Sequence, residues 1–380
     1  MGQANGGAPA RLSDNQRIAW LRLIRTPNVG PASFRALIGR FGSAQAAIES
    51  LPEMMRSSGS KRPARIPSIA DVEAELEHAR KCGARFIAIG EHDYPALLKQ
   101  MDMAPPLLAV MGDTSIFQRP AVAMVGARNA SIAGMKFARR IAEDLGRSGH
   151  AVVSGLARGV DTAAHEGALK TGTGAAVAGG LDRPYPPQNA DLMTAIAECG
   201  GAVVSEMPFG WVPRAQDFPR RNRLIAGLSL GLLVVEAARR SGSLISARLA
   251  GEMGRIVFAV PGSPLDPRSE GTNKLLKDGA ILVTGVDDVI ETIAPLIDRP
   301  ATSLARLDEP VELDRALPPA DNDRARVTEA LGATPVSIDD LVHHTGLHPS
   351  EISLILLELD LAGKLERHSG GAVSLILTVD

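Results

Sequence analysis

Between residues 121 and 260, short apolar runs with high β-strand propensity alternate with longer segments of helical periodicity. This alternation favours a mostly parallel sheet, because each crossover helix returns the chain to the same end of the sheet and covers one of its faces. We therefore predict the α/β fold class, with a mostly parallel sheet and helices on both faces. The predicted strands are Ala121–Val125, Ala151–Val153, Ala175–Ala178, Ala202–Val204, Gly231–Val235 and Ile256–Val260. Two earlier runs, Phe86–Ile89 and Leu107–Val110, are candidates for further strands at the start of this sheet.

The rest of the chain divides by composition and periodicity. Residues 1–15 are rich in glycine, alanine and polar residues and are predicted to be disordered, whereas residues 16–65 contain two helical patterns around a turn, which predicts a small helical domain. The α/β domain is predicted to extend over 66–298, and a proline-rich, acidic stretch over 299–323 predicts a linker. Residues 324–380 have the outline of a winged-helix domain, with predicted helices Arg324–Leu331, Ile338–Thr345 and Pro349–Ala362 before a β-wing.

Charge is unevenly distributed along the chain. The formal net charge is −2, but residues 119–285 hold 20 Lys and Arg against 14 Asp and Glu, whereas residues 286–380 hold 7 against 18. The middle of the chain could therefore bind a polyanion, while the C-terminal part would repel one. Arginine outnumbers lysine 33 to 8, which suits bidentate contacts to phosphate but also fits a GC-rich genome.

Several classes of protein are excluded by what the sequence lacks. Its apolar runs are far shorter than the ~20 residues needed to cross a bilayer, and its N-terminus lacks the features of a secretory signal or a myristoylation site. Cys82 and Cys199 are far apart and have no His or Cys at ligand spacing, so neither a disulfide framework nor a zinc ribbon is predicted. We expect a cytoplasmic protein with no membrane contact, no metal and no cofactor.

Residues 125–128 (VGAR) follow the first predicted strand and open the next helix. Such a turn presents free backbone N–H groups at the positive end of the helix dipole. Gly126 would permit close approach of an anion, and Arg128 can hold a phosphate with two N–H groups. Neither a Walker A loop nor a regular dinucleotide fingerprint is present, because no Gly-Lys-Ser/Thr follows and Arg128 fills the second glycine position. A bare tight turn is the alternative interpretation.

Residues 154–165 (SGLARGVDTAAH) follow the second predicted strand and place Ser154, Gly155 and Gly159 between that strand and a helix. Asp161 is of a type that caps helix N-termini, and His165 lies four residues later on the same helical face. The two could form a metal or acid–base pair. The alternative is a cap with a supporting hydrogen bond, since no third metal ligand is visible.

Three arginines open a later helix, in the segment FPRRNR at residues 218–223. Cations at a helix N-terminus oppose the helix dipole and are destabilising unless anions or acidic side chains pair with them. This local conflict favours anion binding by Arg221, Asn222 and Arg223. Ion pairing with Glu206 or Asp217 is the alternative for at least one of these arginines.

The fifth predicted strand leads into a further turn, Ser241-Gly242-Ser243, at the start of a helix. Because the carboxyl ends of parallel strands meet at one edge of a sheet, four turns rich in Gly, Ser and Arg would line a single groove for several phosphates. Aromatic side chains that could stack on nucleobases are few, namely Tyr185, Phe209, Trp211 and Phe218.

Together these motifs resemble the DNA-processing protein A (DprA/Smf) family. The segments VGARNASIAG, VVSGLARGVDTAAHEGAL, GGLDRPYPPQN, SEMPFGWVPRAQDFPRRNRLIAGLS, VVEAARRSGSLISARLA and FAVPG…GTNKLLKDGA have that family's order and spacing over about residues 80–285. The resemblance implies a Rossmann-like domain that binds and protects single-stranded DNA without sequence preference. It also implies loading of the RecA recombinase onto that DNA in natural transformation, a homodimer, and no enzymatic activity or catalytic residues.

The resemblance further implies which residues contact the DNA. They are Gly126, Arg128, Ser154, Gly155, Gly159, Asn189, Arg221, Asn222, Arg223, Ser241, Gly242 and Ser243. One position departs from the family pattern: many members have a Lys directly after the Tyr185-Pro186 pair, where this chain has Pro187. Either the affinity for DNA is lower, or a cation such as Arg183 substitutes.

The two terminal domains give weaker functional signals. Residues 27–31 (PNVGP) resemble the hairpin of a helix–hairpin–helix or SAM-like module, whose glycine N–H groups can contact DNA phosphates; a purely structural helical cap is the alternative. The recognition helix expected in the winged-helix domain, HPSEISLILLELDLAG, contains no Lys or Arg. Because insertion into a DNA groove requires positive charge, we expect a protein-interaction or regulatory role for this domain.

An enzyme is the main alternative class. The core is also similar to the nucleotide-binding folds of the phosphoribohydrolase (lysine-decarboxylase-like) group of hydrolases, which carry a Pro-Gly-Gly-x-Gly-Thr stretch and a following Glu. Here no carboxylate follows the comparable turn at residues 241–243 until Glu252. Glu206 or Glu236 could act as a base, but neither has a visible nucleophile or metal partner. An NAD-dependent oxidoreductase is less favoured still, because both the fingerprint and its ribose-binding acid are missing.

Overall fold

The computed structural model describes residues 11–57, 65–297 and 319–376. The chain divides into two compact units. Of the described residues, 74–297 belong to the first unit, and 12–57, 65–73 and 319–376 belong to the second. Residues 1–10 of the segment predicted to be disordered and residues 299–318 of the predicted linker lie outside the described residues.

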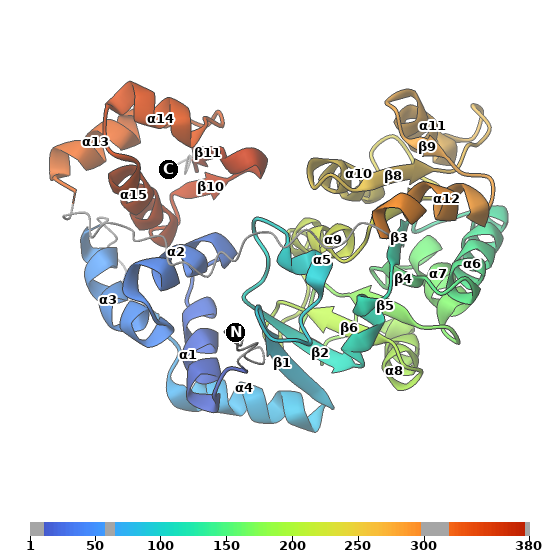
Figure 1. Ribbon diagram of the computed structural model, residues 1–380, viewed down its shortest axis with the longest axis horizontal. Coiled ribbons are helices and arrows are strands. Elements are labelled where there is room, and N and C mark those ends of the chain that lie inside the picture. Colours follow the sequence, from blue (N-terminus) through green and yellow to red (C-terminus); the bar gives the residue numbers. More distant parts are fainter. Residues whose placement is uncertain (1–10, 58–64, 298–318, 377–380) are drawn as a thin grey trace, which may run out of the picture. The chain divides into compact units, whose positions relative to one another are not determined.

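Among the described residues, the first unit is built on a nine-stranded sheet with the order β1-β2-β6-β5-β4-β3-β7-β8-β9 (Figure 1). Its strands are β1 (Ala84–Ala88), β2 (Leu107–Gly112), β3 (Ala121–Val125), β4 (Ala151–Ser154), β5 (Thr173–Ala176), β6 (Ala202–Ser205), β7 (Gly231–Val234), β8 (Ile256–Ala259) and β9 (Ile281–Leu282). Neighbours from β6 to β9 run parallel, whereas β2 runs antiparallel to both β1 and β6. The predicted mostly parallel sheet is confirmed, and the two early apolar runs are its β1 and β2 strands.

Helices cover both faces of this sheet, as predicted (Figure 1). One face packs against α9 (Asp217–Gly227), α10 (Gly242–Glu252) and the short α5 (Ala96–Lys99). The other packs against α6 (Ile132–Arg147), α7 (Val160–Ala168) and α12 (Val286–Ile297), while α8 (Ala190–Glu198) packs beside β5 and β6. The unit also contains most of α4 (Ile69–Lys81) and all of α11 (Glu270–Lys277).

Burial on both faces explains why the central strands are uninterrupted apolar runs. In β3, Ala123 and Val125 face the α9 side, while Val122 and Met124 face the α6 side, and each is at most 4% exposed. Complete burial of such side chains stabilises the fold by roughly 1.5–3 kcal/mol each, methyl-sized alanines contributing less. The polar connections therefore concentrate at the ends of the strands, where ligand sites form.

The second unit joins helices from both ends of the chain around shared apolar side chains. It contains α1 (Asp14–Ile24), α2 (Pro31–Phe41), α3 (Ala44–Ser57), α13 (Asp321–Ala330), α14 (Ile338–Thr345), α15 (Pro349–Leu361) and the hairpin of β10 (Leu365–Arg367) and β11 (Val373–Leu375). Leu354, Leu357 and Leu361 of α15 pack into one cluster with Leu37 and Leu51. The predicted helical domain and winged-helix domain therefore form one packed body.

Two predicted boundaries of this unit shift by a few residues. Helix α1 begins at Asp14, inside the predicted disordered segment, because Ser13 and Gln16 form a reciprocal capping box. Helix α13 begins at Asp321, inside the predicted linker, where Asp321 and Asp323 lie in the first turn. Acidic side chains at that end are favoured by the helix dipole, which the sequence prediction did not weigh against the proline-rich composition upstream.

Candidate nucleic-acid interface

The order of the strands reverses at β3, since the chain fills β4, β5 and β6 on one side of it and β7, β8 and β9 on the other. Crossover helices leave the carboxyl ends of β3 and β7 toward opposite faces of the sheet, which opens a crevice between the two turns. Open α/β sheets bind their ligands at such a point. Residues from the connections after β3, β4, β6 and β7 line this edge, as predicted, and the connection after β5 contributes residues 185–188 as well.

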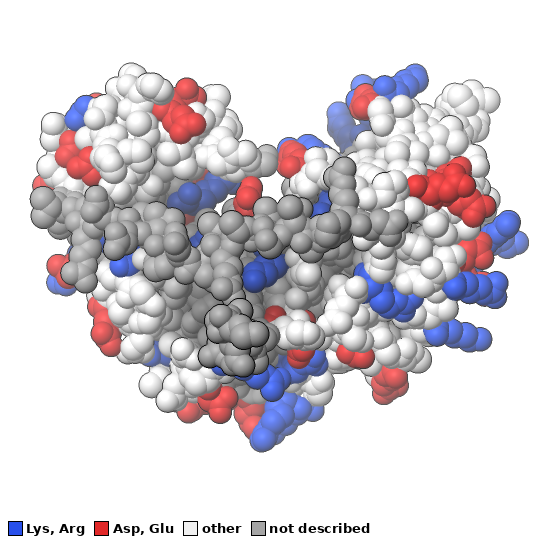
Figure 2. Space-filling view, in the orientation of Figure 1, with Lys and Arg blue, Asp and Glu red and all other residues white. Residues whose placement is uncertain are grey.

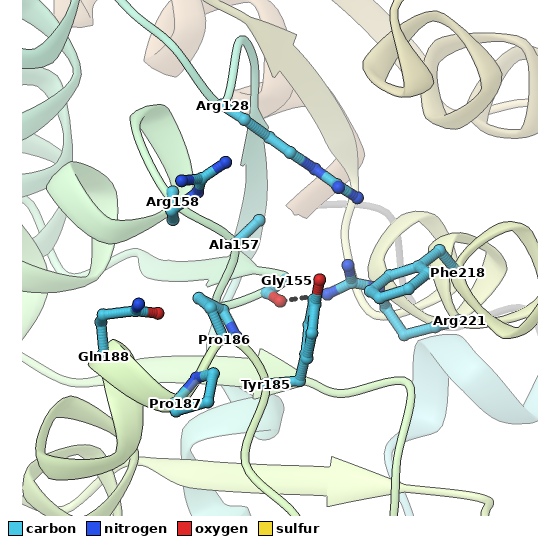
Figure 3. Close-up of a pocket in the computed structure, with 10 residues that line it drawn as sticks. All are labelled: Arg128, Gly155, Ala157, Arg158, Tyr185, Pro186, Pro187, Gln188, Phe218 and Arg221. Carbon is cyan, nitrogen blue, oxygen red and sulfur yellow. Dashed lines mark hydrogen bonds between the residues drawn. The ribbon is translucent and has the colours of Figure 1, made fainter. Parts of the chain in front are cut away.

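Two adjoining hollows occupy this edge. The first, of about 270 Å³, is lined by Arg128, Gly155, Ala157, Arg158, Tyr185, Pro186, Pro187, Gln188, Phe218 and Arg221 (Figure 3). The second, of about 390 Å³, also includes Gly126, Asn222 and the turn of residues 241–243. Because Arg128, Ala157, Phe218 and Arg221 line both hollows, we treat them as one feature, the strand-end groove.

An aromatic and cationic wall surrounds Phe218 in this groove. The Tyr185 ring lies 5.4 Å from the Phe218 ring between centroids, and the Arg128 guanidinium carbon lies 5.2 Å from the centroid of Phe218. Figure 3 shows Arg128 extending across the hollow toward Phe218 and Arg221, with Tyr185 beside them. Tyr185 is 46% exposed, so a ring face is available for stacking with a base, while Arg128 supplies the positive charge that a phosphate requires.

Arg221 lies below this wall as a buried cross-link between two strand ends. Its Nη1 donates to the Gly155 carbonyl, as the dashed line in Figure 3 marks, and to the Ala176 carbonyl at 2.8 Å. A side chain on residue 155 would collide with that guanidinium, which explains the glycine there. Burial lowers the pKa of Arg221 to about 10, with Asp161 opposing this shift and Arg128 adding to it. Arg221 therefore remains charged at neutral pH beneath the groove.

Asp161 supports the second turn and is not paired with His165, whose ring contacts β5 instead. The N-cap of α7 is Gly159, at φ 77°, so the prediction of Asp161 as N-cap is wrong. Only glycine fits there readily, because a Cβ would lie 2.7 Å from the Arg128 carbonyl oxygen. Asp161 Oδ2 instead accepts from the backbone N–H groups of Gly155 at 3.2 Å and Ala157 at 3.3 Å. Burial raises the pKa of Asp161, against the charge of Arg221 and these hydrogen bonds.

The His165 ring is fully buried and linked to β5. Its Nδ1 lies 2.8 Å from Thr173 Oγ1, which itself donates to the Val152 carbonyl at 2.7 Å. Burial lowers the pKa of His165 to about 3, with a smaller effect of Arg221, so the ring is neutral at physiological pH. Within the described part of the chain, no group of three or more His, Cys, Asp or Glu side chains could hold a metal ion.

Three other predicted contact residues hold the turns in place from behind the groove. The fully buried Ser154 hydroxyl donates to the Met124 carbonyl at 2.6 Å and ties β4 to β3. Asn189 Nδ2 donates to the Leu156 carbonyl at 2.8 Å. Gly126 accommodates α7 closely, because a Cβ there would lie 2.5 Å from Val160 Cγ2. The side chains of Ser154 and Asn189 thus position the groove, while Gly126 permits this packing and also lines the second hollow.

The arginine cluster at residues 220–223 separates into different roles. Arg223 pairs with Glu206 and donates to the Met103 carbonyl at 2.6 Å, and its side chain is only 11% exposed. The alternative of ion pairing is thus confirmed for Arg223, which corrects the prediction that it contacts DNA. Asn222 is 9% exposed and lines the second hollow, while Arg220 is exposed. One local sequence pattern therefore contains both structural and surface cations.

The start of α10 forms the end of the groove beyond β7. Ser241 is the N-cap and accepts from the Ser243 backbone N–H at 3.3 Å, while the two hydroxyl oxygens lie 2.7 Å apart. No atom would lie within 4 Å of a Cβ on Gly242. The first N–H groups of this helix and its positive dipole end therefore border open space in the second hollow, where an anion would be stabilised.

Arg158 is the arginine of the second Gly/Ser/Arg turn, but it was not among the predicted DNA contacts. Its exposed side chain lines the first hollow together with Pro187, at the departure from the family pattern (Figure 3). Arg183, the substitute considered from sequence, is not among the lining residues, and its Nε lies 3.6 Å from Asp182 Oδ2. The sequence feature that points to Arg158 is its place between Gly155 and Gly159 in a strand-end turn.

Pairing of charges distinguishes the arginines of the groove from those of α6. Figure 2 shows basic side chains over the region of α6 and acidic ones over α12. The α6 arginines are paired: Arg139 with Glu166, Arg140 with Asp144 and Arg147 with Glu143. Arg128 and Arg158, by contrast, make no ion pair with any described residue. Unpaired cations beside an aromatic wall mark the groove as the stronger anion site.

In the second unit, the hairpin and the expected recognition helix are engaged in contacts within the protein. Asn28 Nδ2 donates to the Leu361 carbonyl at 3.0 Å, and the Gly30 N–H donates to Ser33 Oγ at 2.9 Å. The hairpin amides are thus used internally, which favours the alternative of a structural cap. Glu358 of α15 pairs with Arg324, and Asp360 with Arg367. The expected recognition helix is therefore covered by apolar packing and internal ion pairs.

The fold and the groove together define a Rossmann-type protein with a cationic, aromatic-lined groove at the switch point of its sheet. The chain belongs to the DNA recombination-mediator protein A family, whose model matches residues 85–294. A DprA-like N-terminal HHH domain matches residues 14–78, and a DprA winged helix domain matches residues 311–371. The resemblance inferred from the motifs is confirmed.

Similar proteins include both relatives and solved structures. Protein Smf of Escherichia coli is 41% identical over 310 residues, covering 80% of this chain and 81% of that protein. The DNA processing protein DprA of Streptococcus pneumoniae is 44% identical over 199 residues, covering 52% of this chain and 70% of the relative.

The X-ray structure of the pneumococcal DNA processing protein A covers 74% of this chain and 98% of that one, with 34% identity and a TM-score of 0.62. A structure of DNA processing protein A from Helicobacter pylori, reported for its single-stranded DNA binding mode, covers 56% and 96%, with 30% identity and a TM-score of 0.51. Over the described residues, no helix of this chain combines the length and apolar character needed to span a membrane.

Proposed function

We propose that this protein binds single-stranded DNA along the strand-end groove, without sequence preference, and protects it. One observation carries the proposal: Arg128 and Arg158, which make no ion pair with any described residue, flank the exposed Tyr185 and the half-buried Phe218 at the switch point of the sheet. Phosphates would contact the two guanidinium groups and the start of α10, while a base would stack on Tyr185. The H. pylori relative, described for its single-stranded DNA binding, supports this assignment.

The geometry of the groove favours a flexible single strand over a duplex. Its anion-binding groups come from successive strand-end turns, and the phosphates of a rigid double helix cannot follow such a row while its bases remain paired. Stacking on Tyr185 also requires an unpaired base with a free ring face. Contacts to phosphates and ring faces carry little sequence information, so binding should tolerate any sequence.

The enzyme alternative finds little support in the carboxylates. Glu206 is engaged by Arg223, and Glu236 accepts from the Ser131 backbone N–H at 2.9 Å and its hydroxyl at 2.5 Å. Both carboxylates thus serve structural contacts, and the one hydroxyl beside Glu236, that of Ser131, is itself engaged as the N-cap of α6, where it accepts from the Gly134 N–H at 2.9 Å. We therefore propose a binding protein without catalytic activity, working in the cytoplasm.

Loading of RecA recombinase onto the bound strand, in natural transformation, and assembly into a homodimer are further parts of the proposal. They rest on membership of a family named for mediating recombination. Light scattering of the purified protein would test the dimer, and the growth of RecA filaments on DNA already coated by a single-strand-binding protein would test loading.

A gel-shift comparison over a salt series tests the binding function. We expect tight binding of an oligothymidylate, weaker binding of a duplex of equal length, and no hydrolysis of nucleoside monophosphates. Equal affinity for duplex and single strand would contradict the groove assignment. Release of base from a nucleoside monophosphate would favour the phosphoribohydrolase alternative instead.

A further inference from the structure

The loop after β6, residues 206–216, contains an aromatic–cation pair that lies outside both hollows of the groove. The Arg214 guanidinium carbon lies 4.7 Å from the centroid of the Trp211 ring. Arg214 is exposed and makes no ion pair with any described residue, while Trp211 is partly exposed. An unpaired arginine over an aromatic ring has the composition of a nucleic-acid contact, and nothing in the packing of the core requires it.

Buried Asp217 fixes this pair. Asp217 is 1% exposed, and its Oδ2 accepts from Trp211 Nε1 at 2.9 Å and from the Arg214 backbone N–H at 2.8 Å. Both members of the pair are therefore anchored to one carboxylate at the start of α9. A cation held by its backbone and by a ring loses less conformational freedom on binding than a free surface arginine.

The loop is also braced against the turn that leads to Tyr185. The Gly180 N–H donates to the Trp211 carbonyl at 3.0 Å, and the Gly210 N–H donates to Asp182 Oδ1 at 2.7 Å. These bonds join the connection after β6 to the connection after β5. The pair is consequently built into the same scaffold as the aromatic wall of the groove.

Position along the sheet edge places the pair next to the groove. Strand β6 is the neighbour of β5, whose following turn carries Tyr185, and strands in a sheet lie about 4.8 Å apart. Asp217, which holds Trp211, is followed directly by Phe218 at the centre of the aromatic wall. A strand leaving the first hollow on the β5 side would therefore meet Arg214 next.

We propose that Trp211 and Arg214 form an additional subsite for one more nucleotide of the bound single strand, with Arg214 contacting its phosphate. The inference rests on the proposed function and extends it. It defines the path of the bound DNA strand, which would run from the start of α10, past Arg128, to the loop after β6. Trp211 acts as a positioning residue that holds the guanidinium toward the strand.

Arg214→Ala tests this subsite in the full-length protein. We expect the affinity for a long oligothymidylate to fall about tenfold, corresponding to one charge-assisted hydrogen bond. The slope of log K against log salt should become shallower by about 0.7, the value for one phosphate. Affinity for the shortest oligothymidylate that the wild type binds should be unchanged, because it fills only the groove. Arg214→Lys should retain much of the slope, and Arg140→Ala on α6 is the matched control.

The fluorescence of Trp211 gives a second readout. The chain has two tryptophans, Trp20 and Trp211, so Trp20→Phe leaves Trp211 as the reporter, and long but not shortest oligothymidylate should quench it. An unchanged affinity and slope in Arg214→Ala, with Arg128→Ala weakened and Trp211 unquenched, would overturn the subsite and leave the groove intact. A wild type that binds no single-stranded DNA would overturn the proposed function and the subsite together.

Discussion

Arg128 and Arg223 show how differently two arginines at one sheet edge can act. Arg128 is exposed, unpaired with any described acid, and lies over Phe218. Substitution by Ala removes a charge-assisted hydrogen bond worth about 1.5–3 kcal/mol without opening the core. We expect Arg128→Ala to weaken binding of single-stranded DNA roughly tenfold to a hundredfold, measured by fluorescence anisotropy. The thermal midpoint should stay near that of the wild type, and unchanged affinity would remove Arg128 from the groove.

Arg223 should show the opposite behaviour. Its removal leaves Glu206, whose side chain is 12% exposed, without its cation and the Met103 carbonyl without its donor. Breaking a buried ion pair on one side costs about 3–5 kcal/mol. We expect Arg223→Ala to lower the free energy of urea unfolding by about that amount, while any folded protein keeps its affinity for DNA. A stable variant with weakened binding would restore the DNA-contact role predicted from sequence.

His165 makes the stability of the first unit depend on pH. Its pKa in the folded state is about 3, below the ordinary value of 6.5. Between these values the unfolded chain binds a proton that the folded chain excludes. The contribution is therefore fully present above pH 6.5 and is lost as the pH falls toward 3, at up to about 1.4 kcal/mol per pH unit. His165→Gln should lower the dependence of the unfolding free energy on pH, because one proton fewer is taken up on unfolding. Urea unfolding at pH 7 and at pH 5 measures this difference.

The raised pKa of Asp161 acts in the opposite direction, since the folded state then binds protons more tightly than the unfolded one. For this reason, the pH dependence of the free energy of unfolding is compared between His165→Gln and the wild-type protein, and the wild type is not interpreted alone. Equal pH slopes in the two proteins would show that His165 is not excluded from protonation in the fold.

Sequence reasoning at the residue scale identified where the site lies more reliably than what each side chain does. Turns containing Gly, Ser and Arg marked the sheet edge at which the structure has the strand-end groove, because close backbone approach and anion binding require the same residue types. The roles of Ser154 and Arg223 depend on buried partners at Met124 and Glu206. These partners are distant along the chain, so no local pattern could reveal them.

At the scale of elements, apolar runs predicted β1 to β8 to within two residues, whereas the two-residue strand β9 was not predicted. Because the central strands are buried on both faces, each of them is a continuous apolar run whose length can be recognised in the sequence. The antiparallel direction of β2 and the helix cap at Gly159 were not predictable, since the first depends on pairing with β6 and the second on a positive φ. The packing partner of α15 was not predictable either. Its apolar face alone does not indicate that it packs against the N-terminal helices.

Helix α15 gives a prediction for the second unit. Leu357 is 2% exposed and packs in the cluster that contains Leu37 and Leu51. Truncation of a buried leucine costs about 2–5 kcal/mol through lost burial and a cavity. We expect Leu357→Ala to accelerate amide hydrogen exchange in α1 to α3 as well as in α15, because these helices share one core. Ser353→Ala, on the exposed side of α15, is the control.

Exchange that increases in α15 alone would show that the terminal helices fold independently of the winged-helix domain. This outcome would also restore the division into separate domains predicted from sequence. A loss of DNA affinity in Leu357→Ala, with the first unit intact, would assign the second unit a part in binding.

At the scale of the whole molecule, basic and acidic side chains are concentrated in different parts of the chain. Residues 119–285, which contain the groove, carry more basic than acidic side chains, whereas residues 286–380 are strongly acidic. A polyanion is therefore attracted to one part of the chain and repelled by another. In the fold, the arginines of α6 pair with Glu143, Asp144 and Glu166, whereas Arg128 and Arg158 of the strand-end turns make no ion pair with any described residue.

Salt dependence tests this arrangement as a whole. If Arg128, Arg158 and the start of α10 each hold a phosphate, one protomer neutralises about three charges, and log K against log salt should have a slope near −2. Arg214 would steepen it by about 0.7 if its subsite is filled. Arg158→Ala should make the slope shallower by a similar amount, because that side chain provides the cation beside Pro187. Arg140→Ala, whose charge is paired with Asp144, should leave the slope unchanged. Binding that does not vary with salt, or equal losses from both substitutions, would show that the groove does not hold the DNA backbone.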